Sequence, residues 1–348
     1  MNTELIIENT PIGNGHPMFI IGEVGLAHDG SLGMAHSYID AVANTGANAV
    51  KFQTHLAEYE SSPFEQFRVK VFPQDETRCD YWNRTAFNKK QWHELAAHAR
   101  EVELIFLSSP FSHEAVDLLE TCGMPAWKIA SGEVSNLPLL RRLADTGKPI
   151  LISSGMSSWL ELDEAVGTLK SLKASFGMFQ CTTSYPCPPE TWGLNIIDEI
   201  EQRYNCCTGL SDHSGDIYAG IAGMMKGASM LEVHVVFDRA QFGPDVKSSL
   251  TFEQLAAQVQ GIRQIETAIS RPVDKDAIAV ATEETRKLFS KSLYAAADLK
   301  SGQIVSQDEI LIRKPLIGIP AAQLDSTIGK KLIRPIERNH PITLDHFE

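Results

Sequence analysis

The sequence lacks the features that mark membrane, secreted and zinc-binding proteins. Its 348 residues contain no apolar run long enough to span a bilayer. The N-terminus MNTELIIENT has neither the basic start nor the apolar core of a signal peptide. The six cysteines form no CxxC pair and no zinc-type spacing, so we expect free thiols in a reducing compartment. These absences predict a cytoplasmic protein without a membrane partner.

Positive charge is also scarce. The chain carries 31 Lys and Arg against 44 Asp and Glu, a net charge of −13. A broad nucleic-acid-binding surface would need an excess of basic residues, so we expect no nucleic-acid partner. A small anionic substrate is compatible with this balance only if the cations that bind it are gathered in one place.

Apolar strand-like runs alternate with helical patterns through most of the chain. Eight strands separated by helices over about 250 residues is the count of a (β/α)8 TIM barrel. A doubly wound sheet is the alternative, but it favours a GxGxxG turn after the first strand, where this chain has GEVGLAHDG. The eight runs are Met18–Gly25, Ala49–Thr54, Leu104–Ser109, Ala126–Ala130, Pro149–Ser154, Gly177–Cys181, Cys206–Ser211 and Met230–Phe237.

Two segments depart from this alternation. Residues 55–90 form a long connection, rich in aromatic and charged residues, that follows the second strand and should lie over the C-terminal mouth of the barrel. After about residue 270 the chain turns polar and then shows short apolar pairs broken by Gly, Pro and Asp. We expect a catalytic barrel over residues 1–270, a linker over 271–288 and a small mostly-β domain over 289–348.

Catalytic groups of such a barrel lie at the C-terminal ends of its strands and in the loops that follow. Charged side chains on inner strands are costly unless they are paired or ligated, so a cluster of them predicts a polar active site. A lone polar residue at a strand end is more often structural. The candidates are Glu23, Lys51, Gln53, Lys128, Ser131, Glu133, Ser153, Ser154, Tyr185, Ser211, His213, Glu232 and His234.

The two histidines lie at the C-terminal ends of the last two expected strands, which should be neighbours. Neutral imidazoles favour Mn, Fe, Co or Zn, and only two histidines without a cysteine argue against a closed structural zinc site. His213 and His234 therefore predict an open metal site completed by water, a carboxylate or substrate. Taken singly, each histidine could instead be a hydrogen-bonded strand-end residue.

The two lysines predict an anion pocket. Lys51 and Lys128 supply positive charge, and nearby serines and glycines let backbone N–H groups approach a phosphate or carboxylate. Two other interpretations stay open at this point. A lysine could pair with Glu23 or Glu133, or a buried lysine could form a Schiff base with a carbonyl substrate.

These residues lie in a series of motifs that resembles the sialic acid synthase (N-acetylneuraminate synthase) family over nearly the whole chain. The C-terminal segment from KSLYAAADLKSGQIVSQDEI to GKKLIRPI is similar to the antifreeze-like (SAF) domain of that family. The motifs, in order, are FIIGEVGLAHDGS, NAVKFQTH, FLSSPFS, AWKIASGE, PILISSGM, CTTSYPCPP, GLSDHS, LEVH and FGPD.

The resemblance implies an activity and its partners. The family condenses phosphoenolpyruvate with an open-chain N-acyl hexosamine, such as N-acetylmannosamine or a related aldose, and water. The products are a nonulosonic acid and phosphate. It implies a divalent metal, Mn or Mg, at His213 and His234. It also implies a homodimer in which the antifreeze-like domain caps the barrel of the partner subunit.

The resemblance also implies roles for individual residues. Glu23 is the expected base with Glu133 as a competitor, and Glu232 is a carboxylate beside the metal. The expected phosphoenolpyruvate ligands are Lys51, Lys128, Ser131, Ser153, Ser154 and Ser211. The expected sugar-side residues are Gln53, Tyr185 and Asp245, with Lys314 where the family has a sugar-contacting arginine.

The sugar side departs from the family pattern. Besides Lys314, Thr183 replaces an asparagine and Leu288 replaces an aromatic residue of the acyl pocket. The phosphoenolpyruvate side is intact, so the sequence predicts the reaction class more firmly than the acceptor sugar. A Schiff-base or metal-dependent barrel aldolase acting on a different sugar is the alternative function.

Overall fold

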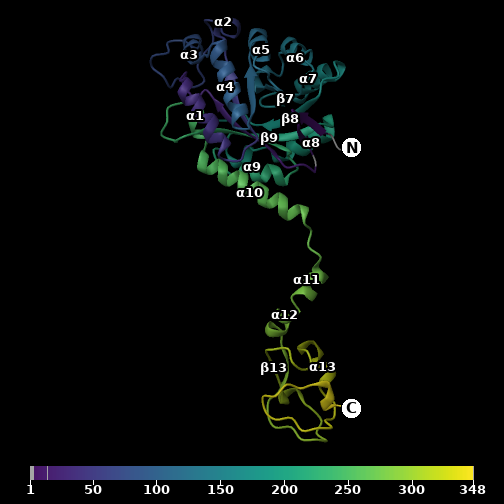
Figure 1. The fold of residues 1–348 in the computed structure, drawn as a ribbon. Coiled ribbons are helices and arrows are strands. Elements are labelled where there is room, and N and C mark those ends of the chain that lie inside the picture. Colours follow the sequence, from purple (N-terminus) through teal and green to yellow (C-terminus); the bar gives the residue numbers. More distant parts are fainter. Residues whose placement is uncertain (1–3, 14, 348) are drawn as a thin grey trace. The chain divides into compact units, whose positions relative to one another are not determined.

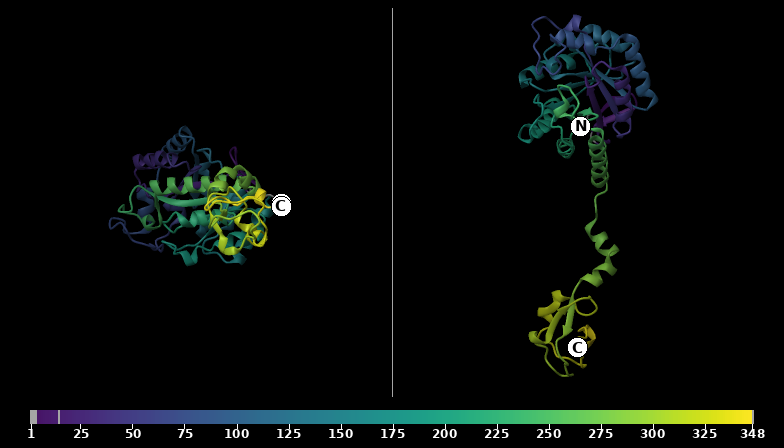
Figure 2. Two further views of the ribbon diagram at one scale, coloured as in Figure 1. Left: turned by 90° about the horizontal axis from the view of Figure 1, so that it is seen from below. Right: turned by 90° about the vertical axis from the view of Figure 1, so that its left-hand side faces the viewer.

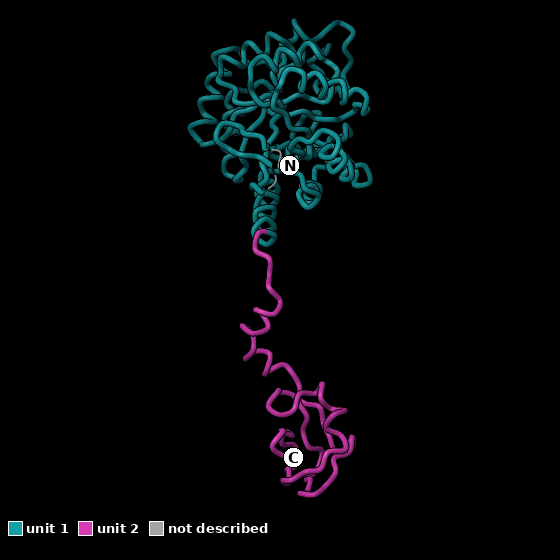
Figure 3. The backbone as a smooth tube through the Cα atoms, turned by 90° about the vertical axis from the view of Figure 1, so that its right-hand side faces the viewer, with its two compact units in different colours: residues 1–269 teal, residues 270–348 magenta. Residues whose placement is uncertain are grey.

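The chain divides into two units between Ile269 and Ser270, shown in separate colours in Figure 3. The computed structural model describes residues 4–13 and 15–347. In that part of the chain, no helix has both the length and the apolar character that a bilayer crossing requires. Helices α11 (Lys275–Ala281) and α12 (Glu283–Phe289) occupy the segment predicted as a linker.

The first unit is the predicted (β/α)8 barrel. Within the described residues its eight parallel strands follow the order β5-β4-β3-β10-β9-β8-β7-β6, and β5 and β6 at the two ends contact each other. The strands are apolar and buried on both faces, as expected of a parallel sheet covered by helices. They are β3 (Phe19–Gly25), β4 (Ala49–Thr54), β5 (Ile105–Pro110), β6 (Trp127–Ile129), β7 (Ile150–Ser153), β8 (Phe176–Cys181), β9 (Cys207–Asp212) and β10 (Met230–Val236).

Amphipathic helices surround the strands in the views of Figure 1 and Figure 2. Polar side chains fix several helix starts: Ser112, Asn136 and Ser158 each accept a hydrogen bond from a first-turn backbone N–H. The surrounding helices are α1 (Leu32–Ala43), α4 (Lys89–Glu101), α5 (His113–Glu120), α6 (Leu137–Ala144), α7 (Trp159–Ser171), α8 (Leu194–Tyr204), α9 (Tyr218–Met225) and α10 (Phe252–Ser270).

An N-terminal hairpin closes the end of the barrel where the strands begin. Strands β1 (Glu4–Ile7) and β2 (Thr10–Gly13) pair antiparallel. Their buried residues Leu5, Ile7 and Ile12 form a core cluster with residues at or near the strand starts, among them Phe19 and Met230. The opposite, C-terminal end is therefore the end at which a ligand can enter. The two-residue strand β11 (Leu250–Thr251) pairs with the end of β10.

The long connection after β4 carries structure of its own. It contains the short helix α2 (Ala57–Glu60) and helix α3 (Arg78–Thr85), which has a capping box formed by Thr77 and Asp80. Tyr81 and Trp82 of α3 form a small apolar cluster with Ala57. The connection is thus a folded element of the barrel unit that follows the C-terminal end of a strand.

The second unit is a small domain with its own core. Strands β12 (Ser292–Ala295) and β13 (Ile310–Arg313) pair antiparallel, isolated bridges extend the pairing, and the short helix α13 (Leu324–Thr327) follows. Its apolar core includes Leu293, Ile319 and Ile342. This arrangement confirms the small mostly-β domain after the barrel.

Candidate active site

A cavity opens at the C-terminal ends of the barrel strands. Most of the side chains that the sequence singled out meet there. It is lined by Glu23, Lys51, Gln53, Ser109, Lys128, Ala130, Ser131, Ser153, Cys181, Tyr185, Ser211, His213, Glu232 and His234.

Strand alternation explains how the apolar strand β10 presents two polar groups. Leu231, Val233 and Val235 belong to the core cluster that the helices cover, while Glu232 and His234 line the cavity. The register with β3 places His234 beside Glu23. The sheet therefore fixes these three groups relative to one another without help from a loop.

The centre of the cavity is a buried cluster of two lysines and two carboxylates. The Lys51 ammonium contacts the Glu23 carboxylate and lies 3.9 Å from Glu232 Oε1. The Lys128 Nζ lies 3.4 Å from the same Glu232 oxygen and donates to Ser153 Oγ at 2.6 Å. All four charged side chains are at most 7% exposed. Both lysines are thus held by carboxylates, so the pairing interpretation and the anion-pocket interpretation apply to the same residues.

Burial and neighbouring charge shift the pKa values of the cluster in different directions. Burial raises the pKa of Glu23 to about 7, because lost hydration outweighs the attraction of Lys51. For Glu232, burial favours the protonated form, but the ammonium groups of Lys128 and Lys51 outweigh it and lower the pKa. Burial lowers the pKa of Lys128. The pKa of the Glu23 carboxyl group therefore lies near neutral pH, while the Glu232 carboxylate stays ionised.

The two histidines lie side by side, with ring centroids 5.4 Å apart. Nδ1–H of His213 donates to the Thr182 carbonyl oxygen at 2.9 Å, which leaves Nε2 as the nitrogen for a ligand. Burial lowers the pKa of His234 to about 4, so its imidazole is neutral at pH 7. Burial also lowers the pKa of His213, but the neighbouring Cys181 thiol outweighs it and raises this pKa to about 9.

These two imidazoles fit an open metal site. Among residues 4–13 and 15–347, no group of three or more His, Cys, Asp and Glu side chains could hold a metal ion. A cation bound to His213 and His234 would need substrate or water for its other ligands, and imidazole favours Mn over Mg. A cation at His213 would also have to displace the proton from that ring.

The sugar-side candidates lie at one edge of the cavity. Gln53 Nε2 donates to Glu23 Oε1 at 2.8 Å. The Tyr185 ring stacks on His213 at 4.1 Å between centroids, and the Arg68 guanidinium covers the Tyr185 ring at 4.1 Å. Arg68 also pairs with Asp245. A loop residue that the sequence analysis did not single out therefore contacts two predicted sugar-side residues.

Four predicted residues do not line this cavity. Ser154 is buried, but its hydroxyl accepts from the Cys181 backbone N–H at 3.2 Å and lies 3.4 Å from Gln180 Oε1, because strand alternation turns it away from Ser153. Glu133 accepts a hydrogen bond from Asn136 Nδ2 at 2.7 Å, and burial raises its pKa. The remaining two are Asp245, which lines a neighbouring pocket, and Lys314, which belongs to the small domain.

Two cavity residues with a hydroxyl or thiol side chain were missed by the sequence analysis. Ser109 accepts a hydrogen bond from Lys51 Nζ at 3.2 Å, and the Cys181 Sγ lies 3.5 Å from Ser131 Oγ. Both stand at the ends of expected strands, so the strand-end rule that found the others could have found them. A Cβ at Gly155 would lie 2.0 Å from Ser131 Oγ, which explains why a glycine follows the two serines there.

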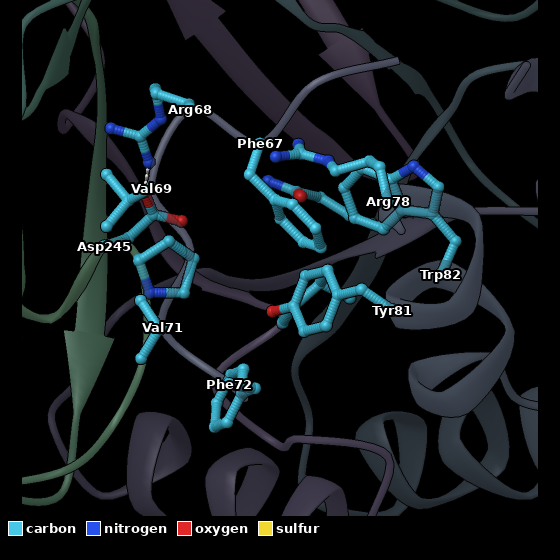
Figure 4. A pocket seen from close by; sticks show the side chains of 12 residues that line it. Phe67, Arg68, Val69, Val71, Phe72, Arg78, Tyr81, Trp82 and Asp245 are labelled. Atoms are coloured by element: carbon cyan, nitrogen blue, oxygen red, sulfur yellow. Dashed lines mark hydrogen bonds and ion pairs between the residues drawn. The ribbon is translucent and has the colours of Figure 1, made fainter. Parts of the chain in front are cut away.

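A second pocket adjoins the first and is shown in Figure 4. Gln53 lines both. The walls of the second pocket come mainly from the long connection after β4, closed by Pro244 and Asp245 from the segment after β10. Its lining is Leu26, Gln53, Phe67, Arg68, Val69, Val71, Phe72, Arg78, Tyr81, Trp82, Pro244 and Asp245.

Comparison with known proteins places the chain in a family. The model of the NeuB family matches residues 38–274, and the model of the SAF domain matches residues 290–348. The N,N'-diacetyllegionaminic acid synthase of Campylobacter jejuni is 33% identical over 89% of this chain and 94% of that protein. The human N-acetylneuraminate-9-phosphate synthase is 30% identical over 95% of this chain and 93% of that protein.

Solved structures show the same fold. The N-acetylneuraminic acid (sialic acid) synthetase of Leptospira borgpetersenii, solved in complex with citrate, superposes with a TM-score of 0.72 at 29% identity. That match covers 82% of this chain and 97% of the other. A spore coat polysaccharide biosynthesis protein of Bacillus subtilis matches 99% of both chains with a TM-score of 0.67 at 28% identity.

Proposed function

Because this chain belongs to the NeuB family and carries a C-terminal SAF domain, we propose that it is a phosphoenolpyruvate-dependent synthase. It joins phosphoenolpyruvate to an open-chain N-acyl hexosamine and water, forming a C–C bond and giving a nonulosonic acid and phosphate. Its relatives named above are synthases of N,N'-diacetyllegionaminic acid and of N-acetylneuraminate 9-phosphate. The observation that carries the proposal is the buried cluster of Lys51, Lys128, Glu23 and Glu232 at the barrel mouth.

The cluster supports binding of a small trianion in an acidic protein. When Glu23 is protonated, two ammonium groups face one carboxylate, and this cluster of four side chains carries one net positive charge. Buried from water, Lys51 and Lys128 act on the phosphate and carboxylate of phosphoenolpyruvate more strongly than surface lysines would. The hydroxyls of Ser109, Ser153 and Ser211 add donors beside them, and these groups would stabilise the departing phosphate.

Glu23 is the group best suited to move a proton. Its pKa near 7 means that both forms are populated at neutral pH, which suits a general base for the water that adds to carbon two. Gln53 donates to one of its oxygens, Oε1, and the Lys51 ammonium contacts the other, Oε2. Glu133, the competing candidate, lies outside the cavity lining, so we assign the role to Glu23.

His213 and His234 would hold a divalent cation, Mn²⁺ in preference to Mg²⁺. When bound, such an ion supplies Lewis-acid polarisation of the aldehyde oxygen of the acceptor. The side chains of the protein position the two reactants. Tyr185, stacked on His213, and Gln53 shape the acceptor side of the cavity, while the lysines hold phosphoenolpyruvate, the nucleophile, on the other side. Proximity of the two reactants then supplies much of the acceleration.

Release of inorganic phosphate tests the proposal. The purified protein is incubated with phosphoenolpyruvate, Mn²⁺ and a panel of aldoses, and phosphate and the nine-carbon product are both measured. We expect phosphate and the keto acid in equal amounts with at least one N-acyl hexosamine. Folded protein that releases phosphate with none of the acceptors would reject the proposed function.

A Schiff-base aldolase is the second candidate, favoured by the lowered pKa of the buried Lys128. Borohydride reduction in the presence of pyruvate separates the two. A Schiff-base enzyme forms a stable adduct on a lysine and keeps its activity in chelator. The proposed synthase forms none and loses its activity when the metal is removed.

Two further expectations go with the proposed function. We propose a homodimer and a cytoplasmic location, both of which rest on the resemblance and on the sequence. Light scattering after size-exclusion chromatography gives the mass of the assembly, and 38.4 kDa is the mass of one chain. Cell fractionation tests the location.

A further inference from the structure

The pocket formed by the long connection has walls suited to a flat, partly apolar group. Four aromatic side chains line it: Phe67, Phe72, Tyr81 and Trp82. Figure 4 shows the Tyr81 hydroxyl pointing into the space that these side chains enclose with Asp245. Tyr81 is 4% exposed, and its hydroxyl has no hydrogen-bond partner among the described residues. A buried donor left without a partner costs stability, so a ligand that accepts from it would gain affinity.

The two arginines of this pocket are already neutralised. Arg68 pairs with Asp245, and Arg78 forms an ion pair with Glu65 in which Nε lies 3.4 Å from Oε1, although this N–H makes no hydrogen bond among the described residues. Their planes are also covered, since Arg68 lies over Tyr185 and Arg78 over Trp82 at 4.2 Å. A phosphate would need cations that are not already paired. The pocket is therefore suited to a neutral group.

The position of the pocket relates it to the acceptor. Gln53 lines both cavities, and Arg68 and Asp245 join the second pocket to Tyr185 at the edge of the first. An acceptor whose aldehyde lies near the histidines would extend past Gln53 toward the aromatic walls. Its far end, away from the reacting carbon, is the part that reaches them.

We propose that the pocket lined by Phe67, Phe72, Tyr81 and Trp82 binds a second, neutral acylamino group at the far end of the acceptor sugar. The methyl group packs against the aromatic rings, and the carbonyl oxygen accepts from the Tyr81 hydroxyl. This selects a 2,4-di(acylamino) hexose over a mono-N-acyl hexosamine and over a sugar 6-phosphate. The proposal rests on the proposed function for its acceptor side.

Three acceptors test it directly: 2-acetamido-2-deoxymannose, its 6-phosphate, and a 2,4-diacetamido-2,4-dideoxy hexose. Phosphate release gives kcat/KM for each with saturating phosphoenolpyruvate and Mn²⁺. We expect the diacetamido sugar to be favoured about tenfold or more, which is the effect of one well-placed hydrogen bond and a buried methyl group. A higher kcat/KM for the mono-acetamido sugar, or for the phosphate, would overturn the proposal.

Two variants test the pocket itself. Tyr81→Phe removes only the hydroxyl and should lower the preference for the diacetamido sugar about five- to tenfold through its KM. Val69→Trp, at a side chain 47% exposed, fills the pocket from its rim and should lower the same preference. Tyr59→Phe, at a 53% exposed tyrosine outside the pocket, is the matched control and should change nothing. Equal losses with both acetamido sugars in Tyr81→Phe would contradict the pocket.

A binding measurement separates this proposal from the proposed function. The alditol of the diacetamido sugar has no aldehyde and cannot react, and Trp82 in the pocket wall supplies a fluorescence signal. We expect saturable quenching by the alditol that weakens about five- to tenfold in Tyr81→Phe. If wild-type protein binds the alditol but releases phosphate with no acceptor, the pocket stands and the proposed function fails. If the alditol does not bind, the pocket assignment fails.

Discussion

The two sides of the barrel mouth are built in different ways. On the side proposed to bind phosphoenolpyruvate, Lys51, Lys128 and Glu232 stand on β4, β6 and β10, and their side chains are at most 7% exposed. On the sugar side, Arg68 and Tyr81 come from the connection between β4 and α4, and the Arg68 side chain is 41% exposed. The first set is positioned by sheet register and the second by a folded loop.

This difference separates chemistry from selectivity. The ladder between β10 and β9 places Glu232 beside Ser211, and neither can shift without breaking the sheet. Residues of the connection can change without disturbing any strand, so one barrel can keep its reaction and exchange its acceptor. Variants on the strand side should therefore remove the reaction, and variants on the loop side should redirect it.

The largest effect is expected for His234→Ala. Loss of one imidazole from the proposed two-histidine cation site should lower kcat by about 10³, which corresponds to about 4 kcal/mol of transition-state stabilisation. The binding of Mn²⁺, measured by calorimetry, should weaken at least about 100-fold. Unfolding temperature should change little, because the ring lines a cavity rather than the apolar core.

The control for this variant is His93→Ala. His93 lies on α4, and its Nε2 forms a hydrogen bond with Thr121 Oγ1 at 3.1 Å. It is not part of the cavity lining. It should keep wild-type kcat and wild-type Mn²⁺ affinity. If His234→Ala also keeps its wild-type kcat, the cation site is wrongly assigned and the difference between the two sides loses its main support.

The next effect is expected for Glu23→Gln, because the amide cannot accept a proton. We expect kcat to fall about 10²- to 10³-fold, within the range of general-base catalysis. The pKa of Glu23 is raised to about 7, and the ionised form is the active base. The wild-type rate should therefore rise as pH increases through about 7. This rise should be absent in Glu23→Gln, measured in buffers that keep Mn²⁺ soluble, and a rise that persists would assign the base to another group.

The strand side could be predicted from the sequence because it follows periodic rules. Eight apolar runs predicted the barrel, and the strand-end rule selected Glu232 and His234, which lie on one face of β10. The same rule also selected Ser154, the residue after Ser153. The Ser154 hydroxyl turns away from the cavity toward Gln180. Ser109 and Cys181 obey the rule but were left out of the site.

The loop side could not be predicted in the same way. The sequence showed that the connection over residues 55–90 is long and rich in aromatic residues. No helical or strand periodicity, however, relates Arg68 to Asp245, which lie 177 positions apart. Their pairing depends on how the connection folds back over the mouth, a tertiary contact without a local signal. The role of Lys314 stays a prediction, because it depends on a contact between subunits that the sequence suggests only by resemblance.

The smallest effect is expected where the two sides meet, at His55. This residue follows β4. Its Nδ1–H donates to Glu60 Oε1 at 2.6 Å, and its Nε2 lies 3.3 Å from Gln53 Oε1. Its ring is stacked between Trp82, at 3.6 Å between centroids, and Phe111, at 4.1 Å. It therefore links the wall of the loop pocket to Gln53, which in turn holds Glu23.

His55→Phe keeps the stack and removes the two ring nitrogens that face Glu60 and Gln53. With Gln53 less firmly oriented, KM for the acceptor should rise about tenfold, the effect of one hydrogen bond to a positioned group, while KM for phosphoenolpyruvate stays within about twofold. His93→Phe makes the same exchange away from the mouth and should leave both constants unchanged. An equal rise in both KM values, with a lower unfolding temperature, would mean that His55 only supports the fold. A selective rise in the acceptor KM would show that the loop pocket acts on the strand-borne groups through this one ring.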